Sequence, residues 1–479
     1  MNYSIIRYIL GWILTISSGL MMIPLGTGIF YQEKETAAFV ITILVSCVIG
    51  IALTRKKPQN QVFHNREGFV TVALSWITLS LIGSIPFVIS RTIPNPIDAL
   101  FETVSGFTTT GASILSDVEV LPRCMLIWRS FTHWIGGMGV LVFILCILPL
   151  TGGYQMSLMK AESPGPSVSR LVPKVKSTAI ILYQIYFVLT LLQIGLLLAG
   201  GLPIFDTLCT AFGTAGTGGF GVKNSSIGGY SVYIQVVTTV FMILFGVNFN
   251  IYFLIIMKKV KAALLVEELR YYFLVILVAI LFISINVRGF FSSIGQTVQQ
   301  VAFQVGSIIT TTGFSTTDFD QWPTFSRTIL VLLMFCGACA GSTGGGIKVS
   351  RFVMLAKTVK KEIQIYLHPN AVKKVKMDGK MISHEVVRAT NIFLVVYIFI
   401  FTLSVLLVSI DNFDPTTNFT AVAATINNIG PGLSRVGPTC NFALFSPLSK
   451  LVLIFDMLAG RLEIMPLVIL LVPNTWKKF

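Results

Sequence analysis

Charged residues are scarce in this chain. Only 11% of its 479 residues are Asp, Glu, Lys or Arg, whereas 54% are hydrophobic and the mean hydropathy is +0.81. Soluble domains carry about 25% charged residues, so a soluble protein of this length could not cover its surface with so few. The composition excludes that class and predicts an integral membrane protein.

Residues with metal-binding or catalytic chemistry are also few. The four histidines are scattered without ligand spacing, and no nucleophile–base pair is present. The seven cysteines lie mostly in apolar segments, which predicts buried thiols rather than a disulfide framework. Cys336-Gly-Ala-Cys339 has redox spacing, but packing of small residues in a membrane segment explains it better. Gly216-Thr-Gly-Gly-Phe-Gly221 lacks the preceding strand of a dinucleotide site. We therefore expect no enzyme and no organic cofactor.

The basic residues are unevenly distributed. The chain has 35 Lys and Arg against 20 Asp and Glu, a net charge of +15, and the basic residues form blocks such as Arg55-Lys56-Lys57 and Lys373 to Lys376. Membrane proteins keep such blocks on the cytoplasmic side. This distribution predicts cytoplasmic termini and contact with anionic membrane lipid or an acidic partner surface. It argues against a nucleic-acid partner.

The apolar segments form an N-terminal pair and four repeats. Residues 5–25 and 36–54 each approach the roughly 20 apolar residues that a spanning helix needs, which predicts an N-terminal membrane hairpin over 1–57. The repeats are expected at 68–149, 176–257, 270–350 and 386–479, with a basic cytoplasmic loop at 351–385. Their spans are expected at 68–90, 124–149, 176–200, 231–257, 270–287, 326–350, 386–409 and 444–472. Together with the hairpin this makes about ten spanning helices.

Each repeat also contains a short apolar segment followed by a polar loop. The short segments, at 96–107, 203–215, 293–309 and 415–427, cannot cross a bilayer. They lead into loops that we centre on Gly111, Gly218, Gly313 and Gly430. Irregular backbone at membrane depth is tolerated only where protein buries it or where it lines a watery cavity. Four re-entrant loops can meet this condition by converging on one axis.

These loops suit a cation pathway. Removing a cation from water costs on the order of 20 kcal/mol in the idealised limit, and rings of backbone carbonyls offset that cost without adding net charge. Glycine can take positive φ and so turn carbonyls toward an axis, while Thr110, Thr217 and Thr312 add hydroxyl oxygens. The C-terminal end of each short helix adds partial negative charge. No carboxylate lies within the loops, which disfavours a divalent cation.

The order of motifs resembles the Trk/Ktr potassium-transport family, most of all its TrkH-type pore-forming membrane subunits. The matching segments are the four loops, Trp134 to Gly139, Ala340 to Lys348, Asn427 to Gly432, and Gly460-Arg-Leu-Glu463. The resemblance implies an all-α membrane fold with four membrane-helix/pore-loop/membrane-helix repeats around a pseudo-fourfold pore. It also implies a homodimer in the bacterial plasma (inner) membrane that binds a cytoplasmic TrkA/KtrA-like ring of nucleotide-binding regulatory subunits.

The resemblance places a potassium selectivity filter on four matching quartets. These are Thr109, Thr110, Gly111 and Ala112; Thr217, Gly218, Gly219 and Phe220; Thr311, Thr312, Gly313 and Phe314; and Asn428, Ile429, Gly430 and Pro431. K⁺ would bind at the filter carbonyls as the transported ion. The fourth loop departs from the Thr-Gly theme, which makes the expected ring imperfect.

A second polar feature interrupts the span 326–350. Its residues are Gly341, Ser342, Thr343, Gly344, Gly345 and Gly346. This run cannot form a firm helix, since each glycine costs about 1 kcal/mol relative to alanine. By resemblance it is a gate beneath the filter, and close packing through small residues is the alternative.

Ionisable residues within apolar segments are expensive and by default functional. The resemblance places Arg461 beside the gate, where it would repel cations. The alternative is a buried charge network with Asp456 and Glu463. We interpret Arg129 and His133, four residues apart, as structural; a proton relay through His133 is the alternative.

The function that these patterns favour is potassium uptake through a channel-like selective pore, gated by the regulatory ring. The alternative is a secondary symporter coupled to Na⁺ or H⁺, with broken helices at its midplane. Coupled transporters usually contain two inverted repeats, whereas these four units run in the same sense.

Overall fold

The computed structural model of the chain is an all-α bundle, and it describes residues 1–58, 64–139, 175–369 and 373–477. The bundle begins with the predicted hairpin: α1 (Tyr3–Leu20) and α2 (Met22–Phe30) form one span that pairs with α3 (Thr36–Thr54). Gly11 and Gly50 let the two backbones approach, because a Cβ on either would lie within 3.0 Å of the opposite helix. Close approach through small residues is a common way to pack membrane helices.

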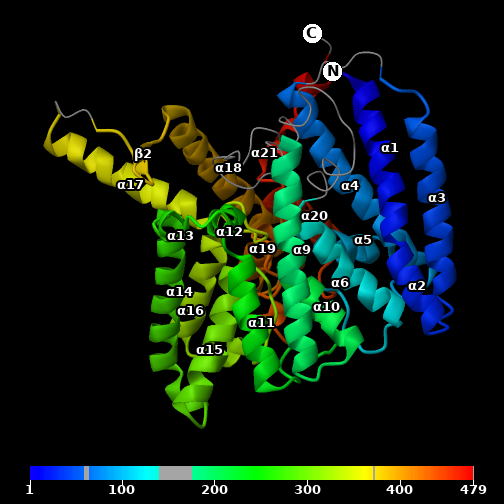
Figure 1. Cartoon of the computed structure of the whole chain (residues 1–479), viewed down its shortest axis with the longest axis horizontal. Coiled ribbons are helices and arrows are strands. Elements are labelled where there is room, and N and C mark those ends of the chain that lie inside the picture. Colours follow the sequence, from blue (N-terminus) through cyan, green and yellow to red (C-terminus); the bar gives the residue numbers. More distant parts are fainter. Residues whose placement is uncertain (59–63, 140–174, 370–372, 478–479) are drawn as a thin grey trace.

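Four repeats follow, each with a long first helix, a short pore helix and a second helix (Figure 1). The first contains α4 (Asn65–Ile89), α5 (Pro96–Phe107) and α6 (Arg123–Gly137), and the second contains α9 (Val175–Ala199), α10 (Ile204–Ala215), α11 (Val232–Phe245) and α12 (Phe249–Ile256). After α13 (Val260–Leu264), the third contains α14 (Glu267–Asn286), α15 (Ile294–Ile309), α16 (Thr324–Cys336) and α17 (Val349–Leu367). The fourth contains α18 (His384–Val408), α19 (Pro415–Ile426), α20 (Pro447–Arg461) and α21 (Met465–Leu471).

Shorter elements connect these helices. Strands β1 (Lys376–Met377) and β2 (Lys380–Met381) form a small antiparallel hairpin between α17 and α18. Short 3-10 turns lie at Arg288–Phe290, Phe319–Gln321, Ser409–Asp411, Ser434–Val436 and Pro473–Trp476.

The pore helices match the prediction closely. Three have 12 residues and α15 has 16, so at 1.5 Å per residue they extend about 18–24 Å, less than a bilayer core. Side chains of Asn95, Ser293 and Asp414 accept backbone N–H bonds at the starts of α5, α15 and α19, as is usual for N-caps. All four helices end two residues before a non-glycine residue with positive φ. The sequence thus stops the four helices in the same register.

The second helices correct the prediction of continuous spans. In the predicted span 231–257, α11 and α12 meet at 91°. In the span 326–350, residues 337–348 separate α16 from α17. In the span 444–472, Glu463 and Ile464 take positive φ between α20 and α21. The predicted span 124–149 ends as helix at Gly137, and its remainder lies outside the described residues. Within the described ranges six helices, or seven counting the bent pair, are long and apolar enough to cross a membrane. Two of these interruptions satisfy each other's hydrogen bonds, because backbone groups left unpaired at the α11–α12 bend bond to the 337–348 loop.

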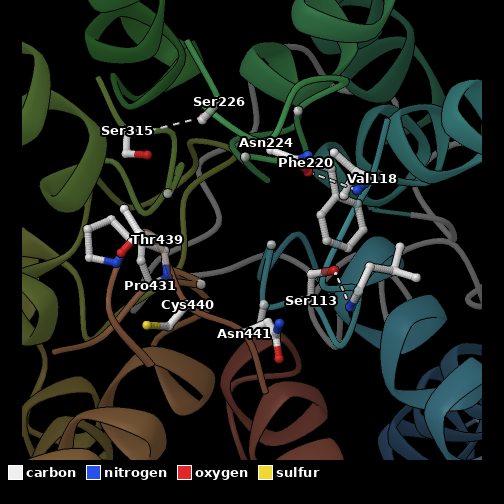
Figure 2. A pocket seen from close by; sticks show the side chains of 18 of the residues that line it. Ser113, Val118, Phe220, Asn224, Ser226, Ser315, Pro431, Thr439, Cys440 and Asn441 are labelled. Carbon is white, nitrogen blue, oxygen red and sulfur yellow. Dashed lines mark hydrogen bonds between the residues drawn. The ribbon is translucent and has the colours of Figure 1, made fainter. Parts of the chain in front are cut away.

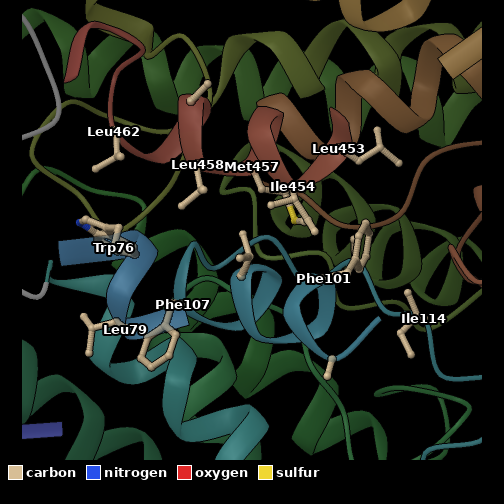
Figure 3. Close-up of a cluster of buried hydrophobic side chains, with 14 of the residues drawn as sticks. Trp76, Leu79, Phe101, Phe107, Ile114, Leu453, Ile454, Met457, Leu458 and Leu462 are labelled. Carbon is tan, nitrogen blue, oxygen red and sulfur yellow. The ribbon is translucent and has the colours of Figure 1, made fainter. Parts of the chain in front are cut away.

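The first and fourth repeats pack directly on each other (Figure 3). In that view, Ile454, Met457 and Leu458 of α20 face the first repeat, where Phe101 and Phe107 of α5 lie. At the same interface Lys450 pairs with Asp98 at 2.6 Å. This contact closes the four repeats into a ring.

The basic segments and the chain ends share one end of the molecule. Helix α17 extends away from the bundle at the end where α1 begins (Figure 1), and the Tyr3 hydroxyl donates to the Trp476 carbonyl oxygen at 2.9 Å. The first half of the predicted 351–385 loop is helical, because α17 continues to Leu367. Its basic residues nevertheless lie at the end expected from charge distribution.

Candidate functional site

The four polar loops form a closed ring. A Cβ added to Gly111 would come within 3.0 Å of the Gly218 carbonyl oxygen, and Gly219 stands in the same relation to Thr312. In the same way, a Cβ on Gly313 would come within 3.0 Å of the Ile429 carbonyl oxygen, and a Cβ on Gly430 within 3.0 Å of the Thr110 carbonyl oxygen. Each glycine therefore packs its Cα against the next loop in the chain, and the glycine of the fourth loop packs against the first loop, which closes the ring. Real Cβ atoms essentially never come so close, so the ring requires glycine at all four positions.

The backbone dihedrals give the register of the four loops. Thr109, Thr217, Thr311 and Asn428 have φ of 54° to 59°, and two residues later Gly111, Gly219, Gly313 and Gly430 have φ of 78° to 98°. The predicted quartets are therefore aligned residue by residue. The predicted central glycine of the second loop is corrected, because Gly219, not Gly218, has positive φ. Gly218 occupies the position of Thr110, Thr312 and Ile429.

A cavity of about 180 Å³ opens on one side of the ring. All four ring glycines line it, together with side chains from each repeat. Figure 2 shows Ser113, Asn224, Ser315 and Pro431 disposed around this opening. Loop-to-loop bonds support it: Val118 N–H donates to Asn224, and Ile227 N–H donates to the Ser315 carbonyl oxygen at 3.0 Å. We name this cavity the vestibule.

The vestibule rim is held partly by a carboxylate. The Asn224 side chain donates to Asp117 at 2.8 Å, and this hydrogen bond, which favours the charged form, holds the pKa of Asp117 below its ordinary value. The first and second loops are thus joined at the rim by an ionised group.

The side-chain oxygens of the loops differ in whether they have a hydrogen-bond partner. Thr110 and Thr312 bond to Thr108 and Thr310 at 2.8 and 2.7 Å, so these hydroxyls brace the backbone. In the described part of the chain, Thr109 Oγ1 and Asn428 Oδ1 are buried without a hydrogen-bond partner. Since buried polar atoms are normally paired, these two oxygens have capacity for a ligand.

The glycine-rich run, residues 341–346, lies against the third and fourth loops on the side away from the vestibule. Gly345 N–H donates to Thr311 Oγ1 at 2.6 Å. A Cβ on Gly344 would come within 3.0 Å of the Thr310 carbonyl oxygen, and a Cβ on Gly345 within 3.0 Å of the Asn427 carbonyl oxygen. The run thus packs directly beneath the ring, and its glycines are required by close backbone approach. We name residues 341–348 the gate loop, after the role that the sequence predicts for this run.

Two cations hold the gate loop, the partly buried Arg461 and the buried Lys348. Arg461 donates to the carbonyls of Thr343 at 2.8 Å, Gly137 at 2.6 Å and Gly136. Lys348, with φ of 83°, donates through Nζ to the Gly344 carbonyl. Gly136 and Gly137 in turn pack under the first and second loops, against Phe107 and Gly216. Arg461 therefore connects the gate loop to the opposite half of the ring.

Comparison with known proteins agrees with this arrangement. The TrkH family, described as cation transport proteins, matches residues 32–478. The chain is 35% identical over 487 residues to the Trk system potassium uptake protein TrkH of Escherichia coli strain K12, covering 100% of both. This chain belongs to the TrkH family. It is also 34% identical over 480 residues to TrkG of the same strain, covering 99% of this chain and 98% of that one. The crystal structure of the potassium transporter TrkH from Vibrio parahaemolyticus matches with a TM-score of 0.89 and 33% identity, covering 100% of both chains.

The expected fold is thereby confirmed. This TrkH-family chain is a multi-pass all-α membrane protein with four repeats around a pseudo-fourfold axis and an added N-terminal hairpin. Its relatives are transport proteins. The Gly216–Gly221 motif belongs to the ring, and Cys336 and Cys339 are free thiols at the end of α16 and beside the gate loop.

Sequence reasoning missed a carboxylate that supports the ring. Glu102 of α5 is 1% exposed and pairs with Arg129 at 2.7 Å. It also accepts from Ser113 Oγ and from Ile114 N–H at 3.0 Å. Arg129 reaches across to the second loop, with its guanidinium 4.1 Å from the Phe220 ring centre. In the third repeat Gln304 stands at the same position, seven residues before the positive-φ residue, and bonds to Thr316 at 3.2 Å.

Removing one partner of this buried pair should destabilise the protein. Arg129→Leu leaves the Glu102 carboxylate uncompensated, and breaking a buried pair in this way costs about 3–5 kcal/mol. Arg327→Leu is the control, because Arg327 and Asp320 are 33% and 27% exposed and such pairs contribute about 0–1 kcal/mol. Thermal denaturation in detergent should show a much larger loss for Arg129→Leu. Equal melting temperatures for the two variants would contradict the assigned role.

His133 joins the end of α5 to the second loop. Its Nδ1 donates to the Gly106 carbonyl oxygen at 2.7 Å, and its Nε2 accepts from Phe220 N–H at 3.2 Å. Both ring nitrogens are therefore occupied by backbone, which is consistent with the structural interpretation and leaves no nitrogen for a relay.

In the described structure, the three residues of the alternative charge network, Asp456, Arg461 and Glu463, bond to different partners. Asp456 accepts from Ser404 of α18 at 2.7 Å. Glu463 pairs with Arg351 of α17, and Arg461 bonds to the carbonyls named above. Helix α20 breaks just after Arg461, so spacing along a continuous helix does not describe these positions.

Proposed function

We propose that this chain takes up potassium through a channel-like pore whose selectivity filter is the four-loop ring. The observation that carries the proposal is the closed order of glycine–carbonyl contacts, which sets four loops around one axis. Backbone carbonyls then replace the hydration shell of a monovalent cation as it passes. Relatives named potassium uptake proteins support K⁺ as the ion.

The filter would consist of the four aligned quartets. Positive φ at alternate positions lets successive carbonyls face one side, and the pore helices present their negative C-terminal ends to the ion. Thr109 Oγ1 and Asn428 Oδ1 are further candidate ligands. At the position where Thr110 and Thr312 each carry a hydroxyl, Gly218 and Ile429 contribute a carbonyl but no hydroxyl, so the four sides of the ring are not identical.

The gate loop would control passage on the side away from the vestibule. Its contacts with Thr311 and Asn427, and the Arg461 positive charge beneath the ring, support a closed arrangement. Opening requires the loop to leave these partners. We place the basic end of the molecule, with both termini, in the cytoplasm of a bacterial inner membrane. There α17 and the β1–β2 hairpin would meet a nucleotide-binding regulatory ring, with the chain acting as a homodimer.

Flux into liposomes distinguishes a pore from a symporter. With the purified protein, ⁸⁶Rb⁺ should enter along its own gradient and be competed by K⁺ far more than by Na⁺. A coupled symporter would instead require a Na⁺ or H⁺ gradient for uptake. Strict dependence on such a gradient would overturn the pore and favour the alternative.

Cys440 provides a test of the vestibule as the outer mouth. It is an exposed free thiol that lines the cavity. A cationic methanethiosulfonate reagent added outside should lower Rb⁺ flux several-fold, since it places bulk and positive charge at the entrance. Cys440→Ser should abolish the effect. Full modification, verified by mass spectrometry, without loss of flux would contradict a pathway through the vestibule.

A further inference from the structure

A single buried carboxylate brackets the gate loop. Glu268 is the second residue of α14 and is 4% exposed. Its Oε1 accepts from Ala340 N–H at 2.6 Å and from Ser350 N–H at 3.2 Å. These residues flank the gate loop at its two ends, so one oxygen atom fixes the separation of both ends.

The two N–H groups need such a partner. Ser350 lies in the first turn of α17, which begins at Val349, and the first four N–H groups of a helix have no intrahelical acceptor. Ala340 lies in the irregular stretch after α16. A negative charge at a helix N-terminus is favourable, and hydrogen bonds to an ionised acceptor are roughly twice as strong as neutral ones. Glu268 is therefore a strong anchor rather than an incidental contact.

Two other contacts of the gate loop come from cations, since Arg461 and Lys348 donate to the Thr343 and Gly344 carbonyl oxygens. The neutral contacts of residues 339–343 concern mainly the first half of the loop. Cys339 N–H donates to the Gly246 carbonyl oxygen at 3.0 Å, and Phe249 N–H donates to that of Gly341 at 3.0 Å. Thr343 Oγ1 donates to the Phe245 carbonyl oxygen at 3.2 Å. These bonds seat the first half in the α11–α12 bend. The start of α17 is joined to the third repeat's first helix through Glu268, and Val349 N–H also donates to the Ala338 carbonyl oxygen at 3.1 Å.

We propose that Glu268 is the positioning residue of the gate: it holds the gate loop in its closed arrangement by tying both ends to α14. This inference rests on the proposed gating function. When the anchor is lost, the two ends of the gate loop keep the Val349 N–H bond to the Ala338 carbonyl oxygen but lose the acceptor that Ala340 and Ser350 share. The contact of Gly345 with Thr311 is then held less firmly. The closed arrangement then becomes less favourable, while the ring of carbonyls is unchanged.

The adjacent residue supplies a matched control. Glu267 pairs with Lys357, farther along α17, and its N–H donates to Asp378 of the β1–β2 hairpin at 2.8 Å. It therefore anchors the outer part of α17 and does not contact the gate loop. Glu267→Ala removes a carboxylate from the same helical turn without touching the two ends of the loop.

The test is ⁸⁶Rb⁺ influx into liposomes containing the purified chain alone. Because losing hydrogen bonds to a charged group shifts an equilibrium by about a factor of ten or more, Glu268→Ala should raise influx about tenfold or more. Glu268→Gln, which keeps an acceptor oxygen but not the charge, should give an intermediate rise. Competition by K⁺ and Na⁺ should stay at wild-type values in both variants, and Glu267→Ala should match wild type.

Unchanged or reduced influx in Glu268→Gln, with normal folding by size-exclusion chromatography, would overturn the inference. So would an equal rise in Glu267→Ala. Gly313→Ala, measured in parallel, separates this failure from that of the pore. If Gly313→Ala alters ion competition and Glu268→Gln leaves influx unchanged, only the anchor is wrong. If Gly313→Ala also has no effect, the filter assignment fails.

Discussion

Gly313→Ala should reduce the preference of the pore for Rb⁺ and K⁺ over Na⁺ by about tenfold or more. The residue has φ of 84°, where an L-residue is disfavoured by about 1–2 kcal/mol. Its Cβ would also overlap the Ile429 carbonyl oxygen and push it from its position in the ring. Since about 1.4 kcal/mol is a factor of ten in an equilibrium constant, the two effects together suffice. The measurement is competition of ⁸⁶Rb⁺ flux by K⁺ and Na⁺.

Gly306→Ala is the control within the same pore helix. A Cβ there has its nearest neighbour, Ile243, at 3.5 Å, an ordinary contact, and alanine is a better helix former than glycine. Flux and ion preference should remain those of wild type. Equal behaviour of the two variants would mean that Gly313 does not shape the pathway.

Arg461→Gln should raise basal Rb⁺ flux by about ten- to a hundredfold. Arg461 holds Thr343 of the gate loop together with Gly136 and Gly137, and each hydrogen bond from a charged group contributes about 1.5–3 kcal/mol. Its loss frees the loop and removes a positive charge beneath the ring. Arg461→Lys should show a smaller rise, because the ammonium keeps the charge but not the planar fork of donors.

Arg435→Gln tests whether any lost positive charge has this effect. Arg435 is exposed on the fourth repeat, 5.3 Å from the Phe413 ring centre, far in sequence from the gate loop. Its replacement should leave basal flux unchanged. A fall in flux for Arg461→Gln, or the same rise for both variants, would contradict a gating role for Arg461.

Local signals predicted the pore helices well. The segments expected at 96–107, 203–215, 293–309 and 415–427 are helical within one residue at each end, because caps and prolines begin them and polar glycine loops end them. The second loop shows the limit of such signals. Gly216, Gly218 and Gly219 lie close together, and the sequence does not show which one carries the positive φ that the ring selects.

The supports of the site were less predictable. Gly246 and Asn248 interrupt the apolar run at 231–257 only briefly, and this short signal was not enough to predict the 91° bend between α11 and α12. Glu102 and Glu268 form no motif with the residues they hold, which are 11 to 82 positions away in the chain. A carboxylate within an otherwise apolar pore helix, or at the first turn of a span, is the one available signal.

The most direct test of the four-loop ring is to locate the ion. Crystals of the protein grown in Rb⁺ and measured at the rubidium absorption edge should show anomalous density on the axis enclosed by Thr110, Gly218, Thr312 and Ile429. The density should weaken when K⁺ replaces Rb⁺ and persist in excess Na⁺. Density elsewhere in the membrane region, with none on this axis, would contradict the account.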